Sequence, residues 1–284
     1  MRGETQALDW WYIRAYPGDV TLMDEAVALL LPWLRDVAAR EQADRWFFVR
    51  YWDLTGHHLR LRIRLSADAA YRLHARLDDV VDLLGCLPAQ GEDRKLVPGA
   101  APAGIRGVQR VSACLYAPEL AKYGGERGVA LAEELFTASS SWIADNRLTD
   151  LAQPGERAAL AVAFMRDLVQ AALPAPGVSA FWEQHRRQWG GHLRMLVRTQ
   201  QELSALMTSV ASSMAGGADV TPRLARSVDE HVKTVVAALD RAEAERNPVP
   251  RPVLLLHYLH MEMNRWGFVP AEECALGILA STTR

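Results

Sequence analysis

Hydrophobic and polar positions follow two different periods along the chain, and the change between them divides the sequence. Up to about residue 125, short aromatic and β-branched runs alternate with stretches in which apolar residues recur every three or four positions. The short runs are typical of β-strands and the longer recurrence of α-helices. From Gly125 onward only the helical period remains. The pattern predicts a sheet-and-helix half over 1–125 and an all-helical half over 126–284.

The first half is expected to run strand, helix, strand, strand, helix, strand. The strands are predicted at 10–16, 46–52, 58–65 and 108–116, and the helices at 21–41 and 69–84. This order is that of the split βαβ, ferredoxin-like arrangement. Further helices are predicted at 126–145, 155–173, 178–214, 221–246, 252–266 and 270–281. We therefore expect an α+β fold in which a ferredoxin-like βαββαβ sheet domain precedes an all-helical C-terminal half, the two forming one compact unit with the site between them.

Composition narrows the function classes only a little. The 284 residues are 50% hydrophobic, and 32 Lys and Arg against 34 Asp and Glu leave a net charge of −2. A charge this close to zero argues against broad binding to nucleic acid or an anionic membrane. The three cysteines lie far apart and no apolar run is long enough to span a bilayer, so we expect a reduced, cytoplasmic protein without a signal peptide. Nine tryptophans indicate an aromatic core or cleft.

The segment 58–65 carries the most specific local pattern. Because side chains of a strand alternate between its faces, His58, Arg60, Arg62 and Arg64 should share one face, and the leucines and isoleucine between them should face the helices. With Tyr12, Arg14 and Arg50 from the neighbouring strands, the open face is expected to form a basic, aromatic-edged floor. Guanidinium groups bind carboxylate and phosphate through two parallel hydrogen bonds. The alternative interpretation is a solvated sheet face with ordinary salt bridges.

Two further segments hold candidate chemistry. His257, His260 and Asn264 share one face of an apolar helix, where a buried histidine suits general acid–base catalysis. Hydrogen-bonded core histidines are the alternative, and a metal site lacks a third ligand, so no metal or cofactor is expected. Tyr116 ends the last predicted strand, and Glu119 and Lys122 follow it in a segment whose alternative interpretation is an interdomain turn capped by two glycines.

In this order, the segments resemble the thiopeptide-type bacteriocin biosynthesis domain, which is also the C-terminal elimination domain of class I lantibiotic dehydratases. The resembling stretches are Trp11-Tyr12-Ile13, 46–53, 58–62, 116–125, 132–136 and 260–265. Each stretch alone is weakly specific, but the ordered set is specific and spans nearly the whole chain. It differs from the family pattern at Lys122, where Arg is usual, and at His257, where Ser is common. His57 and 139–141 also depart from that pattern.

The resemblance implies an enzyme of ribosomal peptide modification: a stand-alone lyase that expels glutamate from glutamylated Ser or Thr to leave dehydroalanine or dehydrobutyrine. His260 would be the catalytic base or proton shuttle, and Arg60, Arg62 and Lys122 the clamp for carboxylate and oxyanion. The partners implied are a precursor peptide with its leader and a separate tRNA-Glu-dependent glutamylating subunit, with no direct contact to nucleic acid or membrane, and a homodimer is allowed.

Two alternatives stay open at the level of sequence. Related stand-alone members of the family close a pyridine ring from two dehydroalanines by formal [4+2] cycloaddition and release the leader peptide. The chain could also be a peptide-binding module without catalysis, in which the strand at 46–52 pairs with an extended leader. The intact set of Arg60, Arg62 and His260 favours elimination, because cycloaddition has no glutamyl carboxylate to hold.

Overall fold

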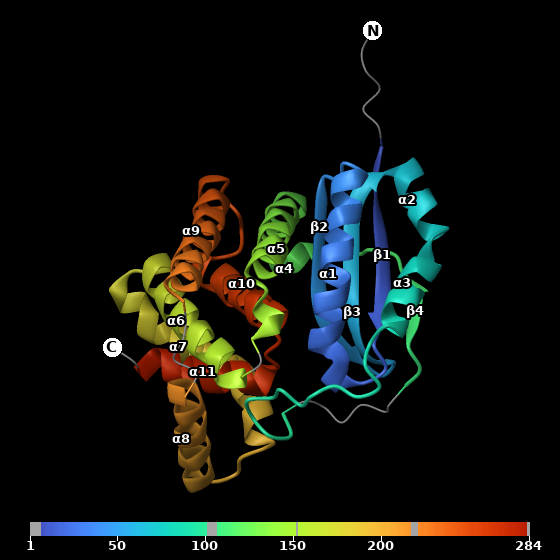
Figure 1. The fold of residues 1–284 in the computed structure, drawn as a ribbon. Coiled ribbons are helices and arrows are strands. Elements are labelled where there is room, and N and C mark those ends of the chain that lie inside the picture. Colours follow the sequence, from blue (N-terminus) through green and yellow to red (C-terminus); the bar gives the residue numbers. More distant parts are fainter. Residues whose placement is uncertain (1–6, 101–106, 152, 217–220, 283–284) are drawn as a thin grey trace. The chain divides into compact units, whose positions relative to one another are not determined.

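The computed structural model describes residues 7–100, 107–151, 153–216 and 221–282, which fall into two compact units (Figure 1). The first unit comprises Met1–Asp93, Gly104–Pro118 and Phe136–Asp145, and the second Arg94–Ala103, Glu119–Leu135 and Asn146–Arg284. We call them the sheet unit and the helical unit. The chain is thus a mixed α+β protein with a helical C-terminal half.

The sheet unit contains a four-stranded antiparallel sheet with strand order β2-β3-β1-β4. Its strands are β1 (Leu8–Tyr16), β2 (Arg45–Asp53), β3 (Gly56–Ser66) and β4 (Arg110–Ala113). Helices α1 (Met23–Arg40), α2 (Ala67–His74) and α3 (Leu77–Gly85) pack on it, and the short η1 (Val20–Leu22) precedes α1. The side chain of Trp11 contacts both Trp33 of α1 and His74 of α2, so these helices cover the same face of the sheet (Figure 1).

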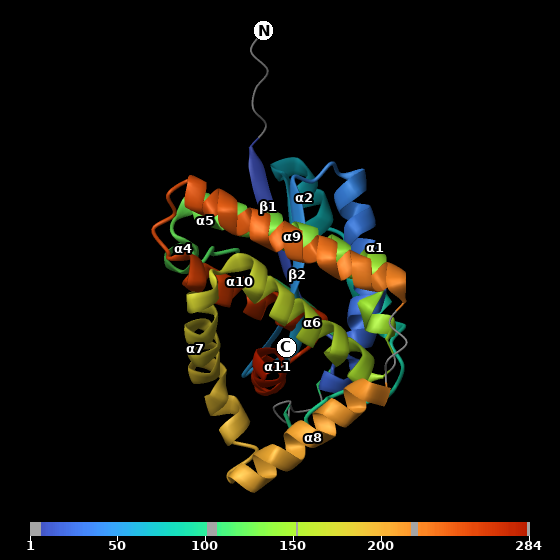
Figure 2. The same ribbon diagram turned by 90° about the vertical axis from the view of Figure 1, so that its left-hand side faces the viewer.

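The helical unit is organised around α6, most of which is buried. Its elements are α4 (Leu120–Tyr123), the first half of α5 (Glu126–Asn146), η2 (Leu148–Asp150), α6 (Pro154–Ala172), α7 (Ala175–Arg194), α8 (Gln200–Gly216), α9 (Pro222–Ala244), α10 (Arg251–Trp266) and α11 (Pro270–Thr282). Helix α6 contacts α8, α9, α10 and α11, and lies between α8 and α9 in Figure 2. The packing leaves α10 and α11 close to α7, which positions the candidate site.

Three predicted elements differ from the structure. The helix predicted at 69–84 is two helices, α2 and α3, and the strand predicted at 108–116 is only β4. The helix predicted at 178–214 is α7 and α8, separated by five residues. The break is explained by a capping box: Glu202 N donates to Thr199 Oγ1 at 3.1 Å, and the Glu202 carboxylate accepts from Thr199 N at 3.1 Å. The motif Thr-x-x-Glu in the sequence marks this helix start.

The prediction that Arg50 belongs to the open sheet face is wrong. In the β2–β3 register Arg50 lies opposite Leu59, whose side chain is fully buried under the helices. Its guanidinium lies 2.7 Å from the carboxylate of Asp24 in the first turn of α1. Strand β2 is apolar on both faces, so alternation alone did not assign Arg50 to a face. Arg50 is therefore a structural residue that ties α1 to the sheet.

Replacing Arg50 by methionine is expected to lower the free energy of unfolding by about 3–5 kcal/mol, because Asp24 is left buried without this guanidinium. Urea denaturation followed by tryptophan fluorescence measures the loss. The double variant Asp24→Leu, Arg50→Met should recover most of it, since a buried ion pair replaced by apolar groups is often neutral. A single variant as stable as the wild type would contradict this account.

Candidate functional site

The face of the sheet opposite α1, α2 and α3 carries the row of basic side chains expected from the sequence, although Tyr12, His58 and Arg62 on it are buried rather than open to solvent. Leu59, Leu61 and Ile63 are at most 1% exposed on the helix-covered face. The alternate residues of β3 therefore point to the other face, and the register places Tyr12 opposite Arg62 and Arg14 opposite Arg60. The predicted alternation of β3 and the place of Tyr12 and Arg14 are confirmed.

The arginines of this face divide into two kinds. Arg14 lies 3.4 Å from Asp53, and Arg64 lies 3.1 Å from Asp44, so both are neutralised by carboxylates. Hydrogen bonds with the Tyr12 and Tyr16 side chains raise the pKa of Arg14 further. Among the residues that the structure describes, no carboxylate lies within 4.0 Å of the guanidinium of Arg60 or Arg62.

Arg62 is enclosed by three aromatic rings. Its guanidinium carbon lies 4.6 Å from the ring centroid of Tyr12, 4.9 Å from that of Tyr116 and 5.2 Å from that of Phe47. Burial lowers the pKa of Arg62, yet a guanidinium stays protonated in proteins. The ring faces attract the cation without neutralising it. Arg62 is thus a fixed positive charge in an apolar setting.

Arg60 stands beside it and is more accessible. Its guanidinium carbon lies 3.2 Å from the ring centroid of Tyr51, which is 41% exposed. Stacking on an aromatic ring restricts the guanidinium plane and leaves its in-plane N–H groups available to an anion. Arg60 and Arg62, two residues apart on one strand face, form a pair of oriented cations.

His58 does not extend this cationic row. Its ring is fully buried, with centroids 4.7 Å from Tyr16 and 5.5 Å from Tyr51, and Nδ1 donates to the Gly56 carbonyl oxygen at 3.0 Å. Burial is the largest cause that lowers the pKa of His58 to about 4. The ring is neutral near pH 7 and packs in the aromatic layer.

The outer edge of β2 is partly covered. The backbone N–H of Trp46 donates to Thr137 Oγ1 and that of Phe48 to Ser140 Oγ, each at 3.3 Å. Both hydroxyls belong to the part of α5 that lies in the sheet unit. A leader peptide that paired with β2 along this stretch would have to displace them.

In the helical unit, His260 on α10 is held by a carboxylate that the sequence did not single out. Its Nδ1 lies 2.7 Å from Glu273 Oε2 of α11, and its ring stacks on Trp189 of α7 at 4.2 Å between centroids. Burial raises the pKa of Glu273, but the charge of His260 and hydrogen bonds from His185 and His260 outweigh it and lower the pKa to about 2. Since the carboxylate is ionised, Nδ1 carries a proton and Nε2 is left to act as a base.

A second histidine lies on the other side of Glu273. His185 of α7 is fully buried, with Nε2 at 3.5 Å from Glu273 Oε1. Its ring occupies the space that a side chain at Gly277 would need. The signal in the sequence is an acidic pair, Glu272 and Glu273, inside an otherwise apolar helix, but which carboxylate meets His260 depends on tertiary packing.

Lys122 lies on α4, which contacts α10, the helix that carries His257 and His260. Its Nζ is 3.2 Å from Glu119 Oε2, and its charge is one cause that lowers the pKa of His257 to about 4, after the larger effect of burial. Glu119 raises the pKa of His257 and His260 lowers it, so these four predicted residues share one electrostatic environment. His257 is therefore neutral near pH 7. Asn264 lies one turn after His260 on α10 and is half-buried.

The short helix α4, which carries Lys122, is fixed to the helical unit by Asn247. The Asn247 amide donates to the Tyr123 carbonyl oxygen at 2.8 Å and accepts from Val249 N at 2.9 Å. Gly124 ends α4 with φ of +85°, and a side chain there would collide with Asn247. The double glycine is thus a helix stop that also lets Asn247 approach.

The predicted residues therefore form two groups, one in each unit. Arg14, Arg60, Arg62, His58 and Tyr116 lie in the sheet unit, and Glu119, Lys122, His257, His260 and Asn264 in the helical unit. Within the described residues, no group of three or more His, Cys, Asp or Glu side chains could hold a metal ion. The helices searched there include none with both the length and the apolarity needed to cross a membrane.

Comparisons with known proteins identify the fold. The chain resembles the tRNA-dependent lantibiotic dehydratase MibB from Microbispora sp. 107891, with a TM-score of 0.57 and 21% identity over 99% of this chain, but it spans only 28% of MibB. It also resembles the pyridine synthase TbtD from thiomuracin biosynthesis, with a TM-score of 0.57 and 18% identity over 96% of both chains. TsrL gives a TM-score of 0.55 and 16% identity over 97% of this chain and 94% of that one.

A comparison with curated proteins finds no significant match. The family model of the lantibiotic biosynthesis dehydratase C-terminal region matches residues 10–283. Because this match extends over nearly the entire sequence, the chain belongs to the lantibiotic dehydratase C-terminal family.

Proposed function

We propose that the protein acts in the maturation of ribosomally made peptides by eliminating glutamate from glutamylated Ser or Thr. The observation that carries the proposal is a pair of oriented arginines, Arg60 and Arg62, that have no carboxylate partner among the described residues, in a chain that also holds a histidine–carboxylate pair, His260 and Glu273. Elimination needs both an anion clamp and a base near neutral pH.

The chemistry needs these residue types. A base removes the Cα proton of the glutamylated residue, and the electron pair left on Cα forms the Cα=Cβ double bond. The bond between Cβ and the ester oxygen breaks, and glutamate departs as a carboxylate. Negative charge develops on the peptide carbonyl oxygen and on the leaving group, which positioned cations stabilise. The product is dehydroalanine from Ser or dehydrobutyrine from Thr.

Each residue has a role in this proposal. His260 Nε2 accepts the Cα proton, and Glu273, as a positioning residue, fixes the ring and stabilises the imidazolium that forms. Arg60 and Arg62 hold the glutamyl carboxylates or the developing oxyanion, and Lys122 adds a third cation. We propose that the residues of both groups act on the same glutamylated peptide.

The proposal also includes the fold of the sheet unit and the source of the glutamyl group. The order β2-β3-β1-β4, with helices between β1 and β2 and between β3 and β4, supports a ferredoxin-like description of the sheet unit. The chain spans 28% of MibB, and the proposal includes a tRNA-Glu-dependent glutamylating activity that acts on the same precursor peptide.

Pyridine synthesis is the second candidate. It is favoured by the similarity to TbtD, which extends over 96% of both chains, whereas MibB is much longer than this chain. A cyclase joins two dehydroalanines and has no glutamate to hold. The two arginines, for which the described part of the chain offers no carboxylate partner, are then unexplained, which is why elimination is our first proposal.

Mass spectrometry of the peptide product separates these functions. The protein is incubated with a glutamylated precursor peptide made by a glutamylating enzyme, and separately with a peptide that already carries two dehydroalanines. Elimination converts the glutamyl adduct into a peptide lighter than the unmodified one by one water. A glutamyl adduct that persists, together with a macrocycle from the second peptide, would establish the cyclase instead.

Lys122 offers a graded test of the third cation. Lys122→Arg should retain or raise the elimination rate, because it restores the fork geometry usual in the family, whereas Lys122→Met should lower it by roughly tenfold or more. Because Lys122 is about a quarter exposed and pairs with an exposed Glu119, neither variant should change the thermal midpoint by more than a few degrees. Equal rates for Lys122→Met and the wild type would remove Lys122 from the site.

Glu273→Gln tests the buried carboxylate through pH. The folded-state pKa of Glu273, about 2, lies below its ordinary value of 4.5, so its ionisation stabilises the fold above pH 4.5 and that contribution is lost as the pH falls towards 2. We expect Glu273→Gln to cost about 3 kcal/mol near pH 7, with the difference from wild type shrinking below pH 4.5. Urea denaturation at pH 7, 4 and 3 measures this, and a pH-independent difference would contradict it.

A further inference from the structure

A cavity of about 320 Å³ opens on the helical unit, lined by residues of α7, α8, α11 and the segment between α7 and α8. Its apolar lining includes Leu193, Cys274 and Ile278, and its basic lining Arg186, Arg194 and Arg198. A cavity of this size with an apolar floor and a few charged groups is typical of a ligand site.

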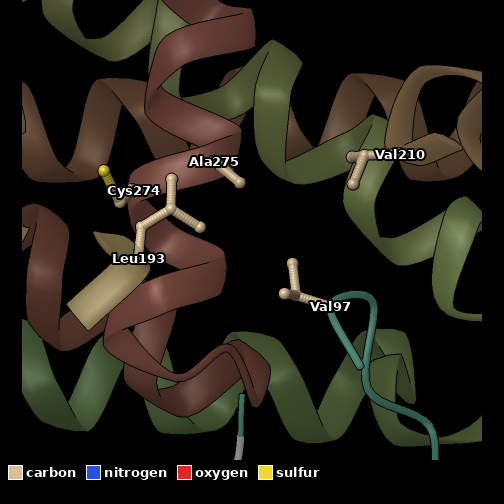
Figure 3. Packing of buried hydrophobic residues seen from close by; sticks show 5 residues of the cluster. All are labelled: Val97, Leu193, Val210, Cys274 and Ala275. Carbon is tan, nitrogen blue, oxygen red and sulfur yellow. The ribbon is translucent and has the colours of Figure 1, made fainter. Parts of the chain in front are cut away.

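The floor of the cavity is part of a packed core. Leu193 and Cys274 are 3% and 2% exposed and belong to a cluster with Val97, Val210 and Ala275, drawn in Figure 3. Burial raises the pKa of the Cys274 thiol to about 11, so this residue contributes an apolar wall and no nucleophile. At the mouth, the capping box at Thr199 and Glu202 fixes the start of α8. The cavity is therefore preformed.

Among the residues described by the structure, no carboxylate lies within 4.0 Å of the guanidiniums of these three arginines, while the Glu202 carboxylate accepts from the backbone N–H of Arg198 at 2.6 Å. The charges of Arg194 and Arg186 reach Cys274, where both act to lower the thiol pKa against the larger effect of burial. These two guanidiniums therefore lie close to the apolar floor. Exposed arginines clustered around an apolar cavity leave positive charge available to a ligand.

We infer that this cavity binds a peptide segment in which apolar side chains are flanked by carboxylates. The apolar floor takes aliphatic or aromatic side chains, and the arginines at the mouth pair with the flanking carboxylates. A nucleic-acid strand fits less well, because its phosphates would leave the buried floor unfilled and the chain as a whole carries a charge of −2.

The inference goes beyond the proposed function, since no residue of the cavity takes part in elimination. Only the identification of the segment as part of the precursor peptide rests on that function. Two helices that line the cavity, α7 and α11, also carry residues that contact the candidate base: Arg186 lies one turn before Trp189, which stacks on His260, and Cys274 follows Glu273. A peptide held there would lie on the unit that carries His260.

Binding is tested by fluorescence anisotropy with a fluorescein-labelled octapeptide that has a Leu-Phe centre and glutamates on both sides. We expect saturable binding that weakens with salt. The variant Arg186→Gln, Arg194→Gln, Arg198→Gln should raise the Kd by roughly tenfold or more. Arg187→Gln is the matched control, because Arg187 is an exposed arginine next to Arg186 on α7 that does not line the cavity.

Three further probes separate the alternatives. A probe with glutamines in place of the glutamates should bind more weakly because it lacks the charges, and one with a Ser-Ser centre because it cannot fill the floor. An RNA oligonucleotide of eight bases should bind more weakly than the acidic peptide. The inference is overturned if the RNA binds more tightly, if the triple variant binds as the wild type does, or if no binding saturates.

These outcomes do not depend on turnover. If the chain eliminates no glutamate but binds the acidic peptide through the three arginines, the peptide-binding role of the cavity is supported and the proposed function is contradicted. If elimination proceeds and the triple variant keeps the wild-type KM and the wild-type Kd, the proposed function is supported and the peptide-binding role of the cavity is contradicted.

Discussion

Replacing His260 by asparagine is expected to slow glutamate elimination by about 10²–10⁴-fold while the thermal midpoint stays within a few degrees of wild type. The amide of asparagine can donate to Glu273 from nearly the position of Nδ1, so the buried carboxylate keeps a partner. It has no group that could take the place of Nε2 as a base. The variant thus separates catalysis from folding, and single-turnover assays with a glutamylated peptide measure the rate.

Two comparisons make the His260→Asn result specific. His260→Ala should lose both turnover and stability, because it removes the donor from Glu273, which is 0% exposed. His192→Asn is the control, since His192 is an exposed histidine of α7 whose ring also approaches Trp189, at 6.3 Å between centroids. If His260→Asn eliminates glutamate at the wild-type rate, His260 is a core histidine and the base lies elsewhere.

The pattern of the sequence predicted β3 well because only one of its faces is apolar. Strict alternation from 58 to 65 leaves one way to place the leucines under the helices, and the basic row follows. Strand β2 gave no such signal, because Trp46, Phe47, Phe48 and Val49 are all buried, and the face of Arg50 was settled only by pairing with β3. A period-two argument works where one face is polar and fails where both are apolar.

Residues of the candidate site could be predicted from the sequence where they belong to one local motif. The spacing of His257 and His260 placed both on one helix face, and in the structure the charges of Lys122 and His260 lower the pKa of His257, after the larger effect of burial. Glu273 was missed because its contact with His260 joins two helices across a turn, and Glu272 beside it has a different task, accepting hydrogen bonds from backbone N–H groups of Leu96, Val97 and Val269. Nothing local to the acidic pair distinguishes the two.

The second large effect is expected at Arg62, where Arg62→Lys should lower kcat/KM for a glutamylated peptide by about 10–100-fold. Lysine keeps the charge but loses the planar fork, and its ammonium is a smaller group for the space between Tyr12, Phe47 and Tyr116. Arg60→Lys should have a similar effect, since the guanidinium plane over Tyr51 is lost. Steady-state assays of released glutamate measure both.

Arg64→Lys is the matched control for these variants, because Arg64 lies on the same face of β3 but is already paired with Asp44 at 3.1 Å. It should leave kcat/KM unchanged. If all three lysine variants behave alike, the row on β3 acts through net charge and the aromatic enclosure of Arg62 has no catalytic consequence. If instead Arg60→Lys and Arg62→Lys lose glutamate release yet convert a peptide with two dehydroalanines into a macrocycle, the arginine pair serves a glutamyl group while the rest of the site can also close a ring. The carboxylate partners on this strand face therefore predict which arginine tolerates lysine: the paired Arg64 should, and Arg60 and Arg62 should not.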